Sequence, residues 1–232
     1  LRTQEGDKTI ELFLSAEGDE VVDVRLTNGR NELILADRNG RAVRFDEADI
    51  RTMGRTATGV RGMRLDGGDD AVVGMIVVND ASKESVMVVS EEGYGKRSEV
   101  EDYRKTSRGG KGVKTLAVTD KTGRLVAIKN VTDQNDLMII NKSGIVIRLA
   151  VADCRVMGRA TQGVRLINLA KKNDVIASVC KVMSSELEAT VEEESRAQWA
   201  QKTDAMRQDT SAPAQTDEID NPADDIEENE TE

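Results

Sequence analysis

The chain has 232 residues, and its 33 Lys and Arg against 43 Asp and Glu give a formal charge of -10. It contains no histidine, which excludes mechanisms that use an imidazole base or ligand. No stretch approaches the roughly 20 apolar residues that span a bilayer, and the N-terminal residues do not resemble a signal peptide, so a cytoplasmic protein without a membrane partner is expected.

Acidic residues concentrate at the C-terminal end of the chain. Residues 183–232 contain 3 Lys/Arg and 16 Asp/Glu, a net charge of -13, which leaves 30 Lys/Arg against 27 Asp/Glu, or +3, for residues 1–182. The acidic overall charge therefore does not exclude a polyanionic partner for the body. We predict an acidic, mostly disordered tail over 183–232, with one short helix over 184–206.

A repeat of just over fifty residues organises the body. Residues 8–25 match only the second half of a unit, and three full units follow. Glycines in a predicted hairpin turn recur with steps of 53 and 51 at Gly40, Gly93 and Gly144. Glycines in a predicted loop recur with the same two steps at Gly59, Gly112 and Gly163. Two independent landmarks with identical steps indicate true structural repeats.

Each unit is predicted to contain four strands. In the first unit these are an apolar run at 32–36, an alternating strand at 41–45 after an Asn-Gly turn, a third strand at 60–65 and a fourth at 71–78. The third strands of the next units are expected at 113–118 and 164–169, and the fourth at 124–131 and 174–182. Four strands in a period of this size are typical of propeller blades.

The predicted fold is therefore all-β and propeller-like, with three and a half blades. The boundaries are a half blade at 1–25, blades at about 26–78, 79–131 and 132–182, and the tail at 183–232. Because propellers usually close with four to eight blades, and because the chain starts at Leu1 inside a unit, further blades are expected upstream in a longer protein.

Two glycine motifs first suggest other ligands. Gly54 and Gly59 have the spacing of a nucleotide-binding loop, but Val and Arg follow where that loop needs Lys and Ser or Thr, and no helix begins there. The GxxG at 109–112 lies between predicted strands, whereas a KH domain places its GxxG between helices. Neither a nucleotide site nor a KH clamp is expected.

Catalytic and metal-binding constellations are not apparent. Cys154 and Cys180 lack CxxC spacing and are expected to be small buried residues, with no metal bound. No carboxylate pair recurs with a partner base, so an enzymatic site is the least favoured interpretation. No catalytic residue and no cofactor is assigned to this chain.

Four positions are basic in all three units, twelve residues in total. They are Arg44, Arg97 and Arg148; Arg51, Arg104 and Arg155; Arg55, Arg108 and Arg159; and Arg61, Lys114 and Arg165. A single such position would be explained by an arginine that is simply solvated at the surface. Recurrence at four positions instead predicts a continuous basic band that binds an extended polyanion. The loop residues Gly109, Gly110, Lys111 and Gly112 are expected to add backbone N–H groups and charge to this band.

Duplex DNA is favoured over single strands as the polyanion. The chain has only 2% aromatic residues, and none recurs in the loops, so base stacking is poorly supplied. A curved basic rim would bend a duplex without reading its sequence. The alternative from another class is a protein scaffold whose arginines meet an acidic partner.

The repeats at 51–62, 103–116 and 155–167 resemble those in the C-terminal domains of DNA gyrase A subunits, which belong to the type IIA topoisomerases. The resemblance covers roughly 1–182. The family's box, QRRGGKG, is matched by TSRGGKG at 106–112, where Thr106 and Ser107 replace Gln and Arg. We interpret this copy as a degenerate one, with the full box upstream. The homologous protein of topoisomerase IV, whose blades lack the box, is the alternative.

The resemblance implies a six-bladed β-pinwheel that exchanges strands between blades and wraps duplex DNA, in support of ATP-dependent negative supercoiling. It implies that the complete enzyme is an isomerase. The tyrosine that attacks DNA and the DNA gate would lie upstream of this chain, and ATP and Mg²⁺ would bind to a partner protein. It also implies an A₂B₂ heterotetramer that contains the gyrase B protein and a second copy of the A protein, in the cytoplasm on the chromosome. The acidic tail is often a regulator of wrapping in this family.

Overall fold

The computed structural model describes residues 2–3, 9–13, 20–54, 57–169 and 174–184. The chain divides into two compact units, 1–187 and 188–232, and all described residues belong to the first unit. The helix and the disorder predicted for the acidic tail therefore lie outside the described residues. No helix among the described residues is long and apolar enough to cross a membrane.

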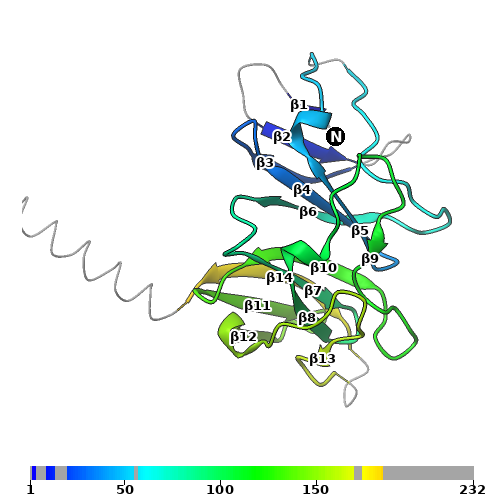
Figure 1. The fold of residues 1–232 in the computed structure, drawn as a ribbon. Coiled ribbons are helices and arrows are strands. Elements are labelled where there is room, and N and C mark those ends of the chain that lie inside the picture. The colour runs from blue at the N-terminus through cyan, green and yellow to red at the C-terminus, as the bar shows by residue number, and fades with distance from the viewer. Residues whose placement is uncertain (1, 4–8, 14–19, 55–56, 170–173, 185–232) are drawn as a thin grey trace, which may run out of the picture. The chain divides into compact units, whose positions relative to one another are not determined.

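Four antiparallel sheets form the described body (Figure 1). The first sheet has the order β1-β2-β3, with β1 (Arg2–Thr3), β2 (Thr9–Phe13) and β3 (Val21–Leu26). The second has the order β6-β4-β5-β9, with β4 (Glu32–Asp37), β5 (Arg41–Asp46), β6 (Val72–Val78) and β9 (Val113–Lys114).

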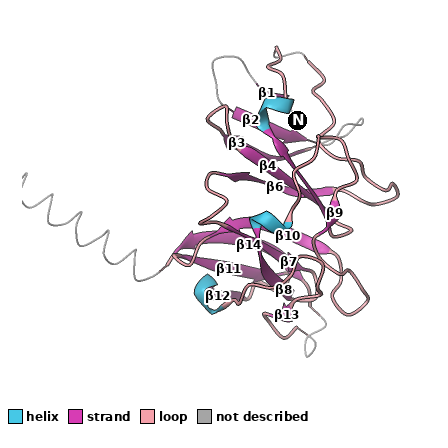
Figure 2. Ribbon diagram, in the orientation of Figure 1, coloured by secondary structure: helices cyan, strands magenta, loops and turns pink. Residues whose placement is uncertain are grey.

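The third sheet has the order β10-β7-β8-β13, with β7 (Ser85–Ser90), β8 (Tyr94–Glu99), β10 (Leu125–Val131) and β13 (Val164–Arg165). The fourth has the order β12-β11-β14, with β11 (Asn135–Asn141), β12 (Val146–Ala150) and β14 (Ile176–Met183). Single 3₁₀ turns follow β5, β8 and β12 as η1 (Glu47–Asp49), η2 (Val100–Asp102) and η3 (Val151–Asp153), drawn as short coils in Figure 2.

The sheets exchange strands between successive repeats. Strand β9, from the second repeat, pairs with β5 of the first through Arg41 and Ala42. Strand β13, from the third repeat, pairs in the same way with β8 of the second through Tyr94 and Gly95. This confirms the exchange that the resemblance implied, and each of these two blades is completed by the repeat that follows it.

The third strands are the part of the strand prediction that was wrong. Residues 60–65 form no strand, and in the next two repeats only β9 and β13, two residues each, are strands within the predicted stretches. These segments instead make separate backbone hydrogen bonds to the neighbouring repeat, such as Arg64 N to Gly110 O at 2.9 Å. The alternation of apolar and polar residues indicated an extended chain, but it did not indicate which segment that chain would pair with.

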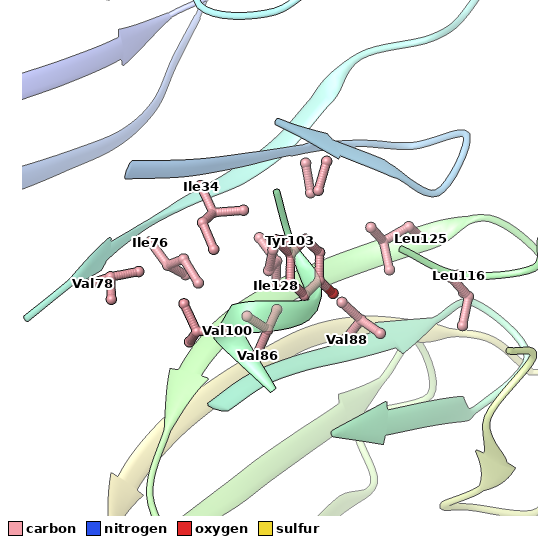
Figure 3. Packing of buried hydrophobic residues seen from close by; sticks show 12 residues of the cluster. Ile34, Ile76, Val78, Val86, Val88, Val100, Tyr103, Leu116, Leu125 and Ile128 are labelled. Atoms are coloured by element: carbon pink, nitrogen blue, oxygen red, sulfur yellow. The ribbon is translucent and has the colours of Figure 1, made fainter. Parts of the chain in front are cut away.

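The core is apolar on both faces of the first strand in the first two full repeats. Leu33 and Leu35 on β4 join one buried cluster, while Ile34 and Ala36 join another that spans two blades. Figure 3 shows this second cluster, in which Tyr103 lies among aliphatic side chains from β4, β6, β7 and β10. Because neighbouring blades cover both faces of a sheet, the run at 32–36 is continuously apolar instead of alternating.

The predicted hairpin turns are confirmed by the backbone. Gly40, Gly93 and Gly144 have φ of 78°, 75° and 84°, the left-handed region that the turns require. Of the cysteines, Cys154 is buried as expected, but Cys180 is exposed, so that expectation was wrong for it. Successive side chains of a strand point to opposite faces. Because Val179 on β14 is buried, the next residue, Cys180, points to the exposed face of the strand.

Candidate nucleic-acid interface

The first group of exposed cations follows the 3₁₀ turns. After each turn comes one buried residue that anchors the backbone in the core: Ile50, Tyr103 and Cys154. The next residue in each repeat is an exposed arginine, and we call these three the turn row: Arg51, Arg104 and Arg155. None of their guanidinium groups has a hydrogen-bond or ion-pair partner among the described residues. They are therefore free to bind an external anion.

The second group lies where the chain crosses to the neighbouring blade, and we call it the strand row: Arg61, Lys114 and Arg165. All three residues are exposed. Arg165 Nη2 donates to the Tyr94 hydroxyl at 2.9 Å, and its guanidinium carbon lies 5.3 Å from the centre of that ring. Lys121 approaches the same ring at 5.5 Å. Tyr94 thus holds two cations at the start of β8 through cation–π contacts.

A turn-row arginine lines a hollow at each of two blade junctions. One hollow of about 210 Å³ is lined by Arg104 of the turn row together with Lys111 and Gly110. The other, of about 330 Å³, is lined by Arg155 of the turn row and Arg165 of the strand row. Each junction therefore presents two cations around a concave surface large enough for an oxyanion group.

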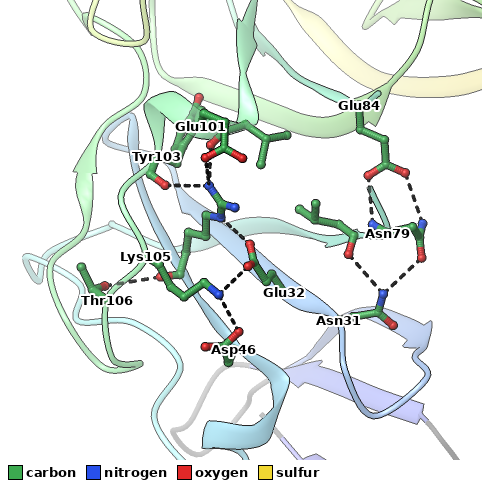
Figure 4. Close-up of polar contacts among 12 residues, drawn as sticks. Asn31, Glu32, Asp46, Asn79, Glu84, Glu101, Tyr103, Lys105 and Thr106 are labelled. Atoms are coloured by element: carbon green, nitrogen blue, oxygen red, sulfur yellow. Dashed lines mark hydrogen bonds and ion pairs between the residues drawn. The ribbon is translucent and has the colours of Figure 1, made fainter. Parts of the chain in front are cut away.

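The third group, the inner row, is Arg44, Arg97 and Arg148, and it has internal partners. Arg44 is only 6% exposed and Arg97 8%. Arg44 Nε donates to Glu32 Oε2 at 2.5 Å, and its Nη1 donates to the carbonyls of Val100 and Tyr103 at 2.9 and 3.1 Å, as Figure 4 shows around Glu32 and Tyr103. This guanidinium therefore ties β4 and β5 to the 3₁₀ turn of the next repeat.

The other members of the inner row also have internal partners. Arg97 Nη1 donates to Asp133 Oδ1 at 2.5 Å. Arg148 Nε donates to Asp136 Oδ2 at 2.7 Å and its Nη2 to the carbonyl of Met183 at 2.8 Å. Arg44 and Arg97 are buried as well as paired and are poorly placed to reach phosphate, whereas Arg148 is paired but exposed. The structure thus separates these two buried arginines from the exposed rows, which recurrence alone did not.

The fourth group, the loop row, is Arg55, Arg108 and Arg159. Arg55 lies outside the described residues. Arg108 donates from Nε to the carbonyl of Asp49 at 3.0 Å and from Nη1 to that of Arg61 at 3.1 Å. Arg159 repeats these bonds one blade later, from Nε to Asp102 O at 3.0 Å and from Nη1 to Lys114 O. Both arginines therefore contact the preceding blade.

The loop glycines serve the same crossing. Gly112 and Gly163 have φ of 73° and 81°, and a Cβ on either would overlap a backbone carbonyl of the neighbouring blade, that of Ala42 or Gly95. Gly109 has φ of 79° and donates its N–H to Gly62 O at 2.6 Å. Gly112 and Gly163 thus allow two blades to approach each other. The contact with a ligand that sequence reasoning gave Gly109, Gly110 and Gly112 stays a prediction.

Some of the cations near the first junction are paired with carboxylates. Lys111 Nζ lies 2.5 Å from Asp66 Oδ1, and Lys105 lies 2.5 Å from Glu32 and 3.0 Å from Asp46 (Figure 4). Burial alone would raise the pKa of Glu32, but the hydrogen bonds from Lys105 and Arg44 hold it below its ordinary value. Lys105 was missed by sequence reasoning because the equivalent residues, Thr52 and Val156, are not basic.

Lys96 is a buried cation that the sequence did not single out. Its Nζ donates to Ser98 Oγ at 3.2 Å, to Gly158 O at 2.9 Å and to the carbonyl of Arg159. Burial and the nearby Arg159 guanidinium lower its pKa to about 8. The equivalent positions hold Val43 and Ile147, so the pattern predicted an apolar residue. Lys96 fastens the third repeat's loop to β8.

Comparison with protein families identifies the repeats. A family model described as the DNA gyrase C-terminal domain, a beta-propeller, matches residues 31–79, 84–132 and 135–180. The gyrase A protein of Staphylococcus aureus strain NCTC 8325 is 46% identical over 178 residues, which are 77% of this chain and 20% of that protein. The gyrase A protein of strain MRSA252 is 45% identical over 179 residues, again 77% and 20%. The chain thus spans about a fifth of the length of these curated relatives.

Two solved structures share the fold. The C-terminal domain of DNA gyrase A superposes with a TM-score of 0.65 at 25% identity, covering 72% of this chain and 56% of that one. The C-terminal domain of DNA topoisomerase IV superposes with a TM-score of 0.67 at 29% identity, covering 76% and 55%. Sequence, strand exchange and superposition agree, and the chain belongs to the DNA gyrase C-terminal domain family.

Proposed function

We propose that this chain binds duplex DNA through the turn row and the strand row and bends it across successive blades. The supporting observation is a hollow at each of two consecutive blade junctions, lined by a turn-row arginine and a second exposed cation, Lys111 in the first and Arg165 of the strand row in the second. Phosphates recur regularly along a duplex, so a regularly repeated set of exposed cations matches its backbone without reading bases. Buried Arg44 and Arg97 hold blades together in this proposal and do not contact DNA.

The wider context follows from the relatives. We propose that the chain serves the A protein of a gyrase, which is a type IIA topoisomerase, where bent DNA would be presented for ATP-driven strand passage and negative supercoiling. In this proposal ATP and Mg²⁺ belong to the gyrase B protein, the assembly is an A₂B₂ heterotetramer with two copies of each protein, and the complex acts on the chromosome in the cytoplasm.

The salt dependence of DNA affinity tests the electrostatic contact. Each neutralised phosphate contributes about 0.9 to the slope of log affinity against log salt, so the six cations of the turn and strand rows predict a slope magnitude of at least about 5. Affinity should differ little between duplexes of unrelated sequence. Affinity that is flat with salt, or strongly selective for one sequence, would contradict the proposal.

A charge-matched pair of variants tests the assignment of residues. The triple variant Arg51→Gln, Arg104→Gln, Arg155→Gln should lower the slope magnitude by about 3, because three phosphate contacts are lost. The control variant Arg30→Gln, Lys83→Gln, Lys142→Gln removes the same charge from exposed turns outside both rows and should leave the slope unchanged. Equal effects of the two triples would show that only net charge matters and would reject the turn row as a contact surface.

A further inference from the structure

The loop row carries an inference that rests on the proposed function. Arg108 and Arg159 recur among basic residues, yet their guanidinium groups are directed at protein carbonyls. In both junctions Nε donates to the last residue of a 3₁₀ turn, Asp49 or Asp102, and Nη1 donates to the backbone of the strand row. The same two bonds at successive junctions show that the contact between repeats recurs along the chain.

The acceptors explain why arginine stands here. The last carbonyls of a helical turn lack partners within the turn. A guanidinium presents donors in a rigid planar fork, so one side chain can satisfy a turn carbonyl and a second carbonyl at a fixed separation. An ammonium is a compact charge on a flexible stem, so it does not impose the same planar separation on two carbonyls. The contact thus fixes the turn relative to the crossing segment.

A reverse contact crosses each junction in the other direction. At the first junction, Arg44 of the first repeat donates to the carbonyls of Val100 and Tyr103 in the second. At the second junction, Lys96 of the second repeat donates to the carbonyls of Gly158 and Arg159 in the third. Each pair of blades is therefore joined by cationic side chains from both sides.

These contacts bear directly on the exposed cations. Asp49 and Asp102 stand two residues before the turn-row arginines of their repeats, and the second acceptor belongs to a strand-row residue. We propose that Arg108 and Arg159 are positioning residues that set the angle between adjacent blades, and with it the curvature of the bound duplex, without contacting phosphate themselves.

Two double variants of equal charge separate positioning from phosphate contact. Arg108→Gln with Arg159→Gln removes two loop-row charges, and Arg104→Gln with Arg155→Gln removes two turn-row charges. The turn-row variant should lower the salt slope magnitude by about 1.8. The loop-row variant should leave the slope unchanged but increase the end-to-end distance of a bound duplex, measured by energy transfer between dyes at its ends.

Lysine variants sharpen the result. Arg108→Lys with Arg159→Lys retains the charge but not the fork, so we expect it to weaken the bend as the glutamine variant does. A phosphate contact would instead be rescued by lysine. Rescue of the bend by lysine, or a slope lowered by about 1.8 in the loop-row glutamine variant, would overturn the proposal.

A measurement without DNA distinguishes failure of this inference from failure of the proposed function. Hydrogen exchange in the 232-residue chain reports the bonds from Thr115 N to Gly40 O and from Leu166 N to Gly93 O, which join the exchanged segments to the preceding blade. Loop-row variants should speed exchange at both amides, while turn-row variants should not. Unchanged exchange would overturn the inference even if DNA binding is confirmed, and faster exchange without DNA binding by the parent chain would reject only the proposed function.

Discussion

Strands β8 and β12 occupy the same place in consecutive repeats but differ in burial. The first five residues of β8 are buried, whereas no residue of β12 is. The difference comes from the exchanged strand, because β13 covers the outer edge of β8 and no described strand pairs with that edge of β12. Burial of the outer strand is therefore supplied by the next repeat and not by the strand's own sequence, as in other repeat proteins.

The inner-row arginines show the same contrast. The side chain of Arg97 on β8 is 10% exposed, and that of Arg148 on β12 is 37% exposed. Both donate to an aspartate, but only the first lies beneath a following repeat. A recurring residue can thus be internal in one blade and accessible in another. The predictions below test how far the neighbouring repeat accounts for this difference.

The largest effect is expected from Gly163→Ala. The added Cβ would overlap Gly95 O, and the residue has a positive φ of 81°, so β13 should separate from β8 and the free energy of unfolding should fall by about 3 to 5 kcal/mol. Gly144→Ala is the control, because it has a similar φ of 84° but nothing within 4 Å of the new Cβ. It should cost only about 1 kcal/mol in the same chemical denaturation series. Equal losses would show that covering of β8 does not depend on this close approach.

The variant Lys96→Met should show how much the buried charge of Lys96 lowers the free energy of unfolding, because that effect depends on pH. Below about pH 8 both the folded and unfolded chains bind the Lys96 proton, since its pKa is about 8 when folded and 10.5 ordinarily. Between these values only the unfolded chain binds it, so the stability of the parent chain should rise with pH relative to the Met variant, by about 3 kcal/mol in total. Denaturation of both proteins at pH 7, 9 and 10.5 checks this, and parallel curves would contradict it.

Asp37→Asn compares the first blade with the third, where Asn141 holds the equivalent place. Both residues accept a bond from the backbone four residues later, but Asp37 Oδ2 is buried without a partner among the described groups. Burial raises the pKa of Asp37 to about 6 from 3.8, so its carboxylate is destabilised when ionised. The Asn variant should be more stable by about 3 kcal/mol at pH 7.

The pH dependence of that gain provides its control. Between pH 3.8 and about 6 the folded chain binds a proton at Asp37 that the unfolded chain does not, so parental stability should increase as pH falls through this window. The advantage of Asn should therefore shrink toward pH 4. An advantage that is constant with pH would trace the gain to a source other than the charge.

The smallest effect is expected from Val146→Thr on the uncovered β12. Val146 is 48% exposed, so adding a hydroxyl there should change the unfolding free energy by less than about 0.5 kcal/mol. Val88→Thr on β7, which is fully buried, should cost about 1 to 3 kcal/mol because the hydroxyl loses water. Thermal unfolding of the pair checks the contrast, and a similar loss at both sites would show that β12 is covered in solution.

Much of the fold was predictable because repeats and turn chemistry are local signals. The steps between Gly40, Gly93 and Gly144 reported the period, and the apolar runs at 32–36 and 124–131 reported strands. Strand exchange was not predictable from these residues, because alternation at 113–118 indicates an extended chain without naming its partner. The 3₁₀ turns were missed, although the recurrence of Asp49, Asp102 and Asp153 was a signal for them.

The candidate site was predictable only as a set of recurring charges. Recurrence shows that a cation is needed at a position, but not whether it faces solvent or a carbonyl. Arg104 and Arg108 have the same charge and lie in the same loop, yet one is free among the described residues and the other bonds to Asp49 and Arg61. Only the path of the neighbouring blade decides between these two outcomes.

Strand exchange also affects how the protein can be assembled during synthesis. A chain emerging from the ribosome exposes the outer edge of β5 after Val78 has been made, and that edge gains its partner only when Val113 and Lys114 follow. The two sheets that contain β9 and β13 thus stay incomplete until much of the next repeat has been translated, so these blades are completed in the order of their synthesis.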